Sequence, residues 1–352
     1  MRFFDYSFIK EYALPIGRLE TLCELYLTEE RIQLWLQLYP NAMSMLRKQR
    51  IIDDINSTHT IERMSADKLD VTKIIESDSK PTNIDEMKVM GQFEAIAYWE
   101  SLVTKDNVEP EDILGLHRSL MVRHDGNAGK YRSKDFPHIG YGTATTIKKP
   151  ANTKETRYAL HQFCKSYNES SHDSSLNKLA LAICSTVDYF SISPFDNGNG
   201  RMYRMILAMF LERAGITTHL YSSLEKQILL NLDNHFTALR MSTNGWNGDF
   251  YGYDAFINDI VYDLHQCTIE LNRSFPKPSA GKVSKTDRIR YVIEQSPSDF
   301  TLEYVCRHAP DISKVLIHNT LSDMVKEKII EKRGNTRGVS YSRAKKILNN
   351  FD

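Results

Sequence analysis

The chain has 352 residues, and its 45 Lys and Arg balance 45 Asp and Glu, so its formal charge is zero. At about 100–200 residues per domain, this length indicates two or three domains. Neutrality argues against a protein that coats nucleic acid over its whole surface. No apolar run reaches the roughly 18 residues of a membrane span, and the N-terminus lacks the apolar core of a signal peptide. We therefore expect a cytoplasmic protein with no membrane partner.

Cysteine and histidine spacing gives little support for a metal centre built by the protein alone. The five cysteines form no CxxC pair, and the eleven histidines form neither HExxH nor HxH. Such pairs are typical of structural and catalytic zinc sites. The cysteines are therefore interpreted as reduced thiols.

The first 272 residues read as mainly helical. Apolar residues recur at helical spacing over 17–37, 86–103, 155–168, 174–190 and 201–214. Gly215 follows the last of these segments and is a common helix stop. Residues 136–150 differ, because Gly, Thr and Ile lie between prolines and predict a short hairpin or flap.

The C-terminal part reads as a separate small unit. Residues 273–287 combine prolines, small residues and lysines and predict a linker. Helices are expected at 286–295, 301–307 and 312–327, followed by strand, turn and strand, an order that resembles a winged helix-turn-helix. From 281 onward there are 14 Lys and Arg against 9 Asp and Glu. The predicted organisation is an N-terminal helical segment (1–85), a helical core (86–272), the linker (273–287) and the winged unit (288–352).

The residues most informative about function run from Ser193 to Arg204, with the sequence SPFDNGNGRMYR. A Gly-Asn-Gly loop leading into a helix offers backbone N–H groups and the positive helix end to an anion. Arg201 and Arg204 follow one turn apart, and each guanidinium is suited to phosphate. Together these features predict binding of a di- or triphosphate.

This segment resembles the Fic family signature HxFx(D/E)GNGRxxR. The matching residues are Phe195, Gly198, Asn199, Gly200, Arg201 and Arg204. Gly129-Lys130-Tyr131-Arg132 is similar to the segment that precedes the flap in that family. Residues 231–239 look like the family's N-x-x-x-Y-Y-x-A-L, which would place His235 and Phe236 beside the adenine. The likeness covers roughly 50–270.

The resemblance implies a mainly α, Fic-type core with a small hairpin flap, followed by the winged unit. It also implies transfer of AMP from ATP to a hydroxyl on a target protein. In that scheme the motif histidine is the general base, the acidic residue holds Mg²⁺, and the second arginine grips the γ-phosphate. The flap would hold the target as an added strand. Its residues here would be His138, Ile139, Gly140, Tyr141, Gly142 and Thr143.

The chain departs from the family pattern at two positions. Ser193 stands at the histidine position, and a hydroxyl cannot take up a proton near neutral pH as imidazole does. Asn197 stands at the metal position, where its carbonyl oxygen can still contact Mg²⁺ without adding charge. Three explanations of Ser193 are open: a natural degenerate member, a deliberate inactivating substitution, or another base such as His138.

An inhibitory segment is expected upstream of the core. Many family members carry S/T-x-x-x-E-G/N on an inhibitory helix, and Thr58 and Glu62 match it, whereas Arg63 departs from it. Glu62 on such a helix would pair with Arg204 and take the place of the γ-phosphate.

Two functions follow from these observations. The first is an adenylyltransferase that Glu62 inhibits and Ser193 slows. The second is a catalytically dead nucleotide-binding regulator that acts through its winged unit on DNA or on a protein. In a DNA complex, the helix near 313–326 would enter the major groove, with Lys332, Arg333 and Arg337 on phosphates. A homodimer through the N-terminal helices is a further expectation.

Overall fold

The computed structural model describes residues 4–12, 16–64, 70–76, 80–135, 139–141, 145–148, 151–244, 246, 252–275, 284–294, 296–334 and 339–343. Its contacts divide the chain into two compact units. The larger unit comprises Met1–Ile32 and Met45–Phe275, and the smaller comprises Gln33–Ser44 and Pro276–Asp352. Within these described ranges, no helix combines the length and the apolar character needed to cross a membrane.

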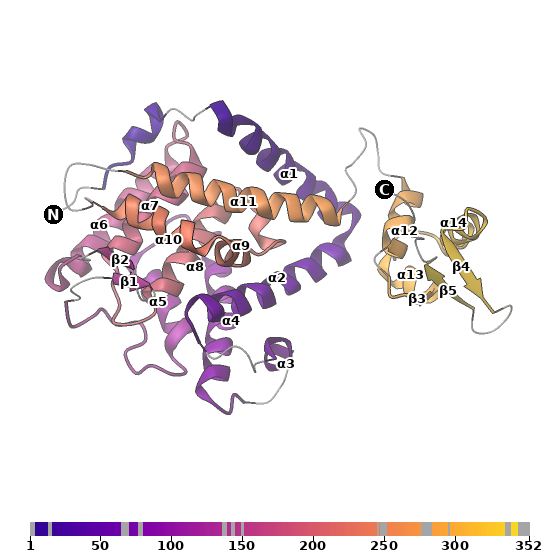
Figure 1. The fold of residues 1–352 in the computed structure, drawn as a ribbon, viewed down its shortest axis with the longest axis horizontal. Coiled ribbons are helices and arrows are strands. Elements are labelled where there is room, and N and C mark those ends of the chain that lie inside the picture. Colours follow the sequence, from indigo (N-terminus) through magenta and orange to yellow (C-terminus); the bar gives the residue numbers. More distant parts are fainter. Residues whose placement is uncertain are drawn as a thin grey trace, which may run out of the picture. The chain divides into compact units, whose positions relative to one another are not determined.

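The larger unit is helical, as the sequence predicts (Figure 1). It begins with short 3-10 turns at Ser7–Glu11 and Ile16–Arg18, which precede the long helices α1 and α2. The end of α1 and the start of α2, within Gln33–Ser44, belong to the smaller unit. The helices are α1 (Leu19–Leu38), α2 (Pro40–Ile61), α3 (Val71–Glu76), α4 (Ile84–Leu102), α5 (Pro110–Met121), α6 (Thr153–His172), α7 (Lys178–Ile192), α8 (Asn199–Arg213), α9 (Leu224–Leu230), α10 (Leu232–Thr243) and α11 (Asp254–Ser274). Another 3-10 turn, Thr218–Leu220, lies between α8 and α9.

Helix α7 lies at the centre of this unit, and every residue from Leu181 to Ile192 is buried. It packs against α6, α8, α10 and α11. Local sequence fixes where these helices begin. The side chain of Asn177 accepts from Ala180 N at the start of α7, and that of Asn152 accepts from Lys154 N at the start of α6. Both are the N-cap residues that helix starts favour.

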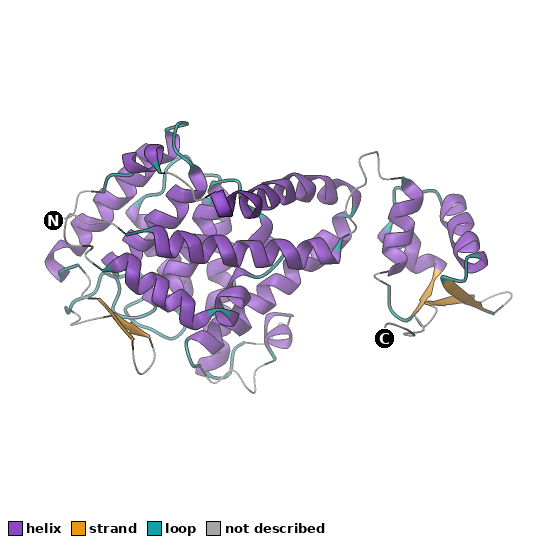
Figure 2. Cartoon of the chain, turned by 45° about the horizontal axis from the view of Figure 1, so that its top comes forward, coloured by secondary structure: helices purple, strands orange, loops and turns teal. Residues whose placement is uncertain are grey.

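The predicted flap is a two-stranded hairpin. Strand β1 (Ile139–Tyr141) pairs antiparallel with β2 (Thr145–Lys148), and Gly140 lies opposite Thr146. Strand β2 packs beside α10. Figure 2 shows the hairpin at the margin of the larger unit. Of the six predicted flap residues, His138, Gly142 and Thr143 lie outside the described part of the chain.

The smaller unit has the element order of a winged helix-turn-helix. Its elements are α12 (Lys285–Glu294), β3 (Asp299–Thr301), α13 (Leu302–His308), α14 (Lys314–Lys326), β4 (Ile330–Arg333) and β5 (Ser340–Arg343). The sheet order is β3-β5-β4, with both pairings antiparallel. Strand β3 was not predicted, because three residues are too few to show an alternating pattern. Its Phe300 stacks on Tyr341 of β5 inside a small apolar core.

Candidate functional site

The loop between α7 and α8, residues 193–198, is named the motif loop, and its shape is fixed by its neighbours. Ser193 ends α7 with a φ of 44°, and Gly198 begins α8 with a φ of 77°. The side chain of Asn199 closes the loop. Its Nδ2 donates to Phe195 O at 2.7 Å, and its Oδ1 accepts from Phe195 N at 3.1 Å. Gly198 offers no capping side chain, so the start of α8 is arranged to receive an anion.

His117 of α5 contacts two residues of the motif loop, a role that the sequence did not indicate. Its ring stacks on Phe195 with centroids 3.6 Å apart. Because Gly129 N donates to Nδ1 at 2.9 Å, Nε2 carries the proton and donates to Asn197 O at 3.1 Å. Burial lowers the pKa of His117 to about 4, which keeps the ring neutral. A Cβ at Gly198 would come within 3.1 Å of Met121 Sδ, so a glycine suits this position.

Arg132 joins the motif loop to the residues that flank the hairpin. Its backbone N–H donates to Pro194 O at 2.8 Å, and its buried Nε donates to Ser193 O at 2.9 Å. The other end of the guanidinium donates to the carbonyls of Lys134 and Ala151. The carbonyls bound by this one side chain therefore lie in the motif loop, before the hairpin and after it.

Ser193 is not arranged as a general base. Its side chain is fully buried, and its hydroxyl donates to Phe190 O at 2.5 Å, within the last turn of α7. The proton of the hydroxyl is thus bonded to a backbone carbonyl of the helix that Ser193 ends. The Oδ1 atom of Asp196, three residues further on, accepts from Ser133 N at 3.3 Å.

Asn197 lies beside the carboxylate of Asp125, which the sequence analysis did not predict to be part of the site. Its Nδ2 donates to Asp125 Oδ2 at 3.2 Å. A hydrogen bond from Asn127 N and the one from Asn197 hold the pKa of Asp125 below its usual value, so the group is ionised. The amide and carboxylate oxygens together are the hard donors that Mg²⁺ prefers.

Both predicted phosphate-binding arginines are buried in the first turns of α8. Arg201 is 7% exposed, and its Nη2 lies 3.1 Å from Met121 Sδ. Arg204 is 2% exposed and pairs with two carboxylates. Its Nη2 lies 2.9 Å from Glu62 Oε1, and its Nε lies 3.1 and 2.8 Å from the two carboxylate oxygens of Glu225.

The end of α2 reaches this site from the N-terminal part of the chain. Helix α2 ends at Ile61, and Glu62 follows in a turn, with its N–H bonded to Thr58 O at 2.9 Å. Thr58 is 1% exposed. His59 of the same turn lies close enough to Arg201 that burial and this guanidinium lower its pKa to about 4. The last turn of α2 and the turn that follows it therefore lie beside the two arginines.

Comparison with known proteins agrees with this geometry. Residues 107–211 match the family model described as Fic/DOC family. The chain contains a Fic/DOC family domain. No curated protein matches the chain.

Solved structures share the fold of this chain. A Fic family protein from Desulfovibrio desulfuricans G20 superposes with a TM-score of 0.63 at 16% identity, covering 95% of this chain and 98% of that chain. A Fic domain containing signaling protein from Bacteroides thetaiotaomicron has a TM-score of 0.57 at 18% identity, over 72% and 95% of the two chains. Fic-1 (aa134–508) from C. elegans has a TM-score of 0.53 at 16% identity, over 72% of each.

The predicted adenine-bordering residues of the Fic domain lie on α10. His235 is fully buried, with Nε2 2.8 Å from the hydroxyl of Tyr203 and Nδ1 2.7 Å from Asp259. The ring of Phe236 is partly exposed and lies edge-on to it at 5.8 Å. His235 therefore links α10 to α8 and α11. Of the two predicted adenine-bordering residues, only Phe236 is partly exposed.

His235, Asp259 and Asp263 also bring potential metal-ligand atoms within 4.8 Å of one another. Both nitrogens of the imidazole already have hydrogen-bond partners, and Asn231 Nδ2 donates to both carboxylates. Burial and the neighbouring Asp259 raise the pKa of Asp263 to about 8, so one of the two carboxyls is protonated near neutral pH. The cluster is therefore a buried network in which most polar atoms are hydrogen-bonded, while Asp263 Oδ2 has no partner among the described residues.

Proposed function

We propose that this chain binds ATP with Mg²⁺ and transfers AMP slowly to a hydroxyl of a target protein. The observation that carries the proposal is the convergence of the motif loop, the start of α8, Arg201 and Arg204. A helix start and two planar guanidinium groups suit a triphosphate better than any uncharged ligand. The Fic/DOC match over residues 107–211 supports nucleotide transfer at the level of the family.

Asn197 and Asp125 would hold the magnesium ion. Their oxygens supply one neutral and one charged ligand at the edge of the phosphate site. A bound Mg²⁺ would neutralise charge on the phosphates during transfer. Asp125 would then provide the charge that Asn197, in place of an acid, does not.

The target segment would bind along the hairpin. An extended peptide can add to an exposed strand edge through backbone hydrogen bonds. Because Ser193 cannot accept the proton of the attacking hydroxyl, transfer would rely on positioning and on phosphate binding by the arginines. Loss of a general base typically costs about 10²–10⁴ in rate.

Glu62 would restrain ATP binding, and its removal provides the first test. In the full-length chain, Glu62→Gly is expected to raise the affinity for ATP by about 10-fold or more, because Nη2 of Arg204 loses a competing carboxylate. Isothermal titration calorimetry in the presence of Mg²⁺ measures this. The affinity for ADP, which lacks the γ-phosphate, should change much less. Glu62→Gln keeps an acceptor but no charge, so its affinity for ATP should lie between that of the unchanged chain and that of Glu62→Gly. Absence of ATP binding in all three chains would refute the nucleotide proposal.

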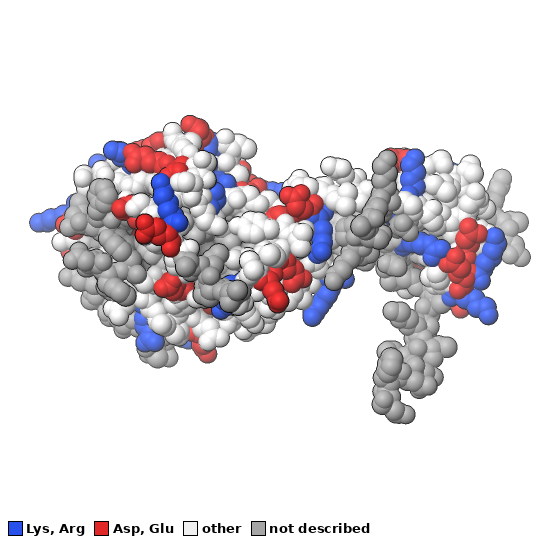
Figure 3. Space-filling view, turned by 90° about the horizontal axis from the view of Figure 1, so that it is seen from above, with Lys and Arg blue, Asp and Glu red and all other residues white. Residues whose placement is uncertain are grey.

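The smaller unit favours protein docking over DNA binding. Four of its described basic side chains lie next to acidic ones, and the face seen in Figure 3 shows acidic and basic residues side by side. The ion pairs are Arg288–Asp311, Arg290–Glu327, Lys326–Asp323 and Arg333–Asp299. On α14, the predicted recognition helix, Val315 is 71% exposed. Arg337, the third predicted DNA contact, lies outside the described residues.

Fluorescence anisotropy with the full chain and a labelled duplex of about 30 base pairs tests this preference. At a physiological ionic strength of about 0.15 M we expect only weak, non-saturating binding. Lys332→Glu with Arg333→Glu should leave it unchanged. Saturable binding that this double substitution abolishes would instead assign the unit to DNA.

A further inference from the structure

Arg204 is held by two acidic side chains that come from different parts of the chain and use different nitrogens. Glu62, beyond the end of α2, contacts Nη2 at 2.9 Å. Glu225, in the first turn of α9, contacts Nε through both of its oxygens, at 3.1 and 2.8 Å. Loss of the Glu62 contact would therefore leave Nε of Arg204 bonded, and loss of the Glu225 contact would leave Nη2 bonded.

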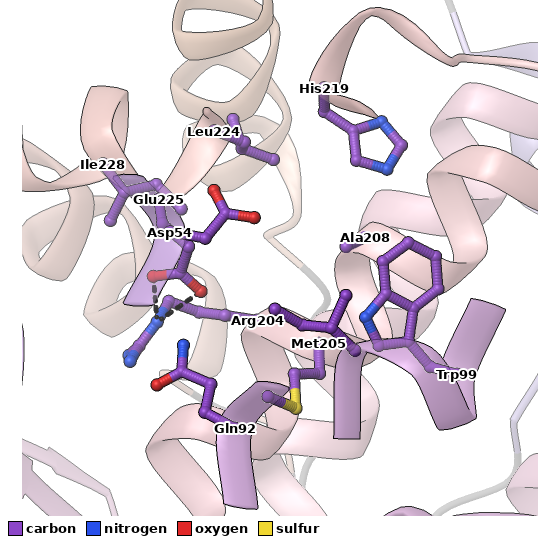
Figure 4. A pocket seen from close by; sticks show the side chains of 11 residues that line it. Asp54, Gln92, Trp99, Arg204, Met205, Ala208, His219, Leu224, Glu225 and Ile228 are labelled. Atoms are coloured by element: carbon purple, nitrogen blue, oxygen red, sulfur yellow. Dashed lines mark hydrogen bonds and ion pairs between the residues drawn. The ribbon is translucent and has the colours of Figure 1, made fainter. Parts of the chain in front are cut away.

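Glu225 is the more firmly positioned of the two. Ser223 is the N-cap of α9, and its hydroxyl accepts from Lys226 N at 3.0 Å and donates to Asp54 of α2 at 2.6 Å. The side chains of Arg204 and Glu225 are 1% and 15% exposed, and they line a small cavity together with Asp54 (Figure 4). Glu62 lies outside any helix, and Arg63 after it has a φ of 52°.

In this arrangement Nε of Arg204 has a firmly held partner, Glu225, and Nη2 has a partner that can be exchanged, Glu62. If Glu62 moves away, Nη2 becomes available to a phosphate oxygen while Nε stays bonded to Glu225. The guanidinium then keeps its orientation, and the binding of the phosphate need not include the cost of ordering a long side chain.

We propose that Glu225 is a positioning residue that holds Arg204 in place for the terminal phosphate of the nucleotide, a role that rests on the proposed ATP binding. Glu62 and the phosphate exchange on Nη2, and Glu225 stays. The site then distinguishes triphosphates from diphosphates through Arg204. Because Glu225 already orders this side chain, binding of the terminal phosphate does not have to order it.

Nucleotide affinity in the full chain carrying Glu62→Gly provides one test. Adding Glu225→Ala should lower the affinity for ATP by about 10-fold, as expected for a lost charge-assisted hydrogen bond. The affinity for ADP should stay within about twofold. Glu225→Gln keeps an acceptor for Nε and should recover most of the loss. Lys226→Ala, on the same helix but paired with Glu270, is the matched control and should change neither affinity.

A second readout does not depend on nucleotide. In protein labelled with ¹⁵N-arginine, the Arg204 Nε–H resonance should stay protected from exchange in Glu62→Gly and lose its protection when Glu225→Ala is added. Protection without any nucleotide binding would refute the proposed function and not the contact. An equal fall in ATP and ADP affinity, tighter ATP binding in Glu225→Ala, or unchanged protection would each overturn the positioning role.

Discussion

Restoring histidine at position 193 is expected to raise the rate of AMP transfer by about 10²–10⁴-fold when Glu62→Gly is also present, because the substitution supplies the missing general base. The backbone at this position accommodates the change. Ser193 has a φ of 44°, and histidine is among the residues found more often than most in the left-handed region. The measurement is incorporation of label from α-³²P-ATP into the protein itself or into a cell extract, with Mg²⁺ present.

The controls decide between the two functions that the sequence left open. Ser193→Ala with Glu62→Gly should transfer no faster than Glu62→Gly alone, because the Ser193 hydroxyl is already bonded to Phe190 O. Label in the histidine variant alone indicates an enzyme slowed by one substitution. ATP binding without transfer in any variant would leave the regulator as the function of this chain.

Replacing Asp188 by leucine is expected to destabilise the larger unit by about 3 kcal/mol or more, because hydrogen bonds to charged groups are among the strongest. Asp188 is a fully buried residue of α7. Its carboxylate accepts from the hydroxyls of Tyr6 and Tyr253 at 2.9 and 3.0 Å and from Trp246 Nε1 at 2.8 Å. Leucine fills a similar volume but takes the acceptor away from three buried donors at once.

Urea unfolding followed by circular dichroism and tryptophan fluorescence measures this effect. Asp188→Asn keeps one carbonyl oxygen and should cost less than leucine. Glu169→Leu is the matched control, because that carboxylate is 67% exposed and pairs only at the surface with Lys165. Equal midpoints for Asp188→Leu and the control would contradict the view that this carboxylate joins distant segments.

Local features of the fold could be predicted from the sequence. Helices such as α6 and α8 show clear apolar periodicity, and the hairpin lies between prolines, so each has a physical cause within a few residues. Strand β3 could not be predicted in the same way, because its pairing with β5 depends on residues about forty positions away. Its three residues have no meaning as a strand without that partner.

For the site, too, the residues that could be predicted are those that lie close together in the sequence. The motif loop and the two arginines were predicted because they are adjacent in sequence. Glu62 was predicted only through the resemblance, and its contact with Arg204 is found in the structure. Asp125 and Glu225 were not predicted, because each approaches the site through a helix packing that no local pattern specifies.

The contacts of Arg132 have a consequence for target choice. This side chain bonds the motif loop to Lys134 before the hairpin and to Ala151 after it, so the span from the flap to the proposed phosphate site would be set by the fold and not by the ligand. A target peptide bound to the flap as proposed could then change only its register. A slip of one residue turns every side chain to the opposite face, so the modified hydroxyl would be selected by counting along the strand, and its immediate neighbours would be passed over even if they too were serine or threonine.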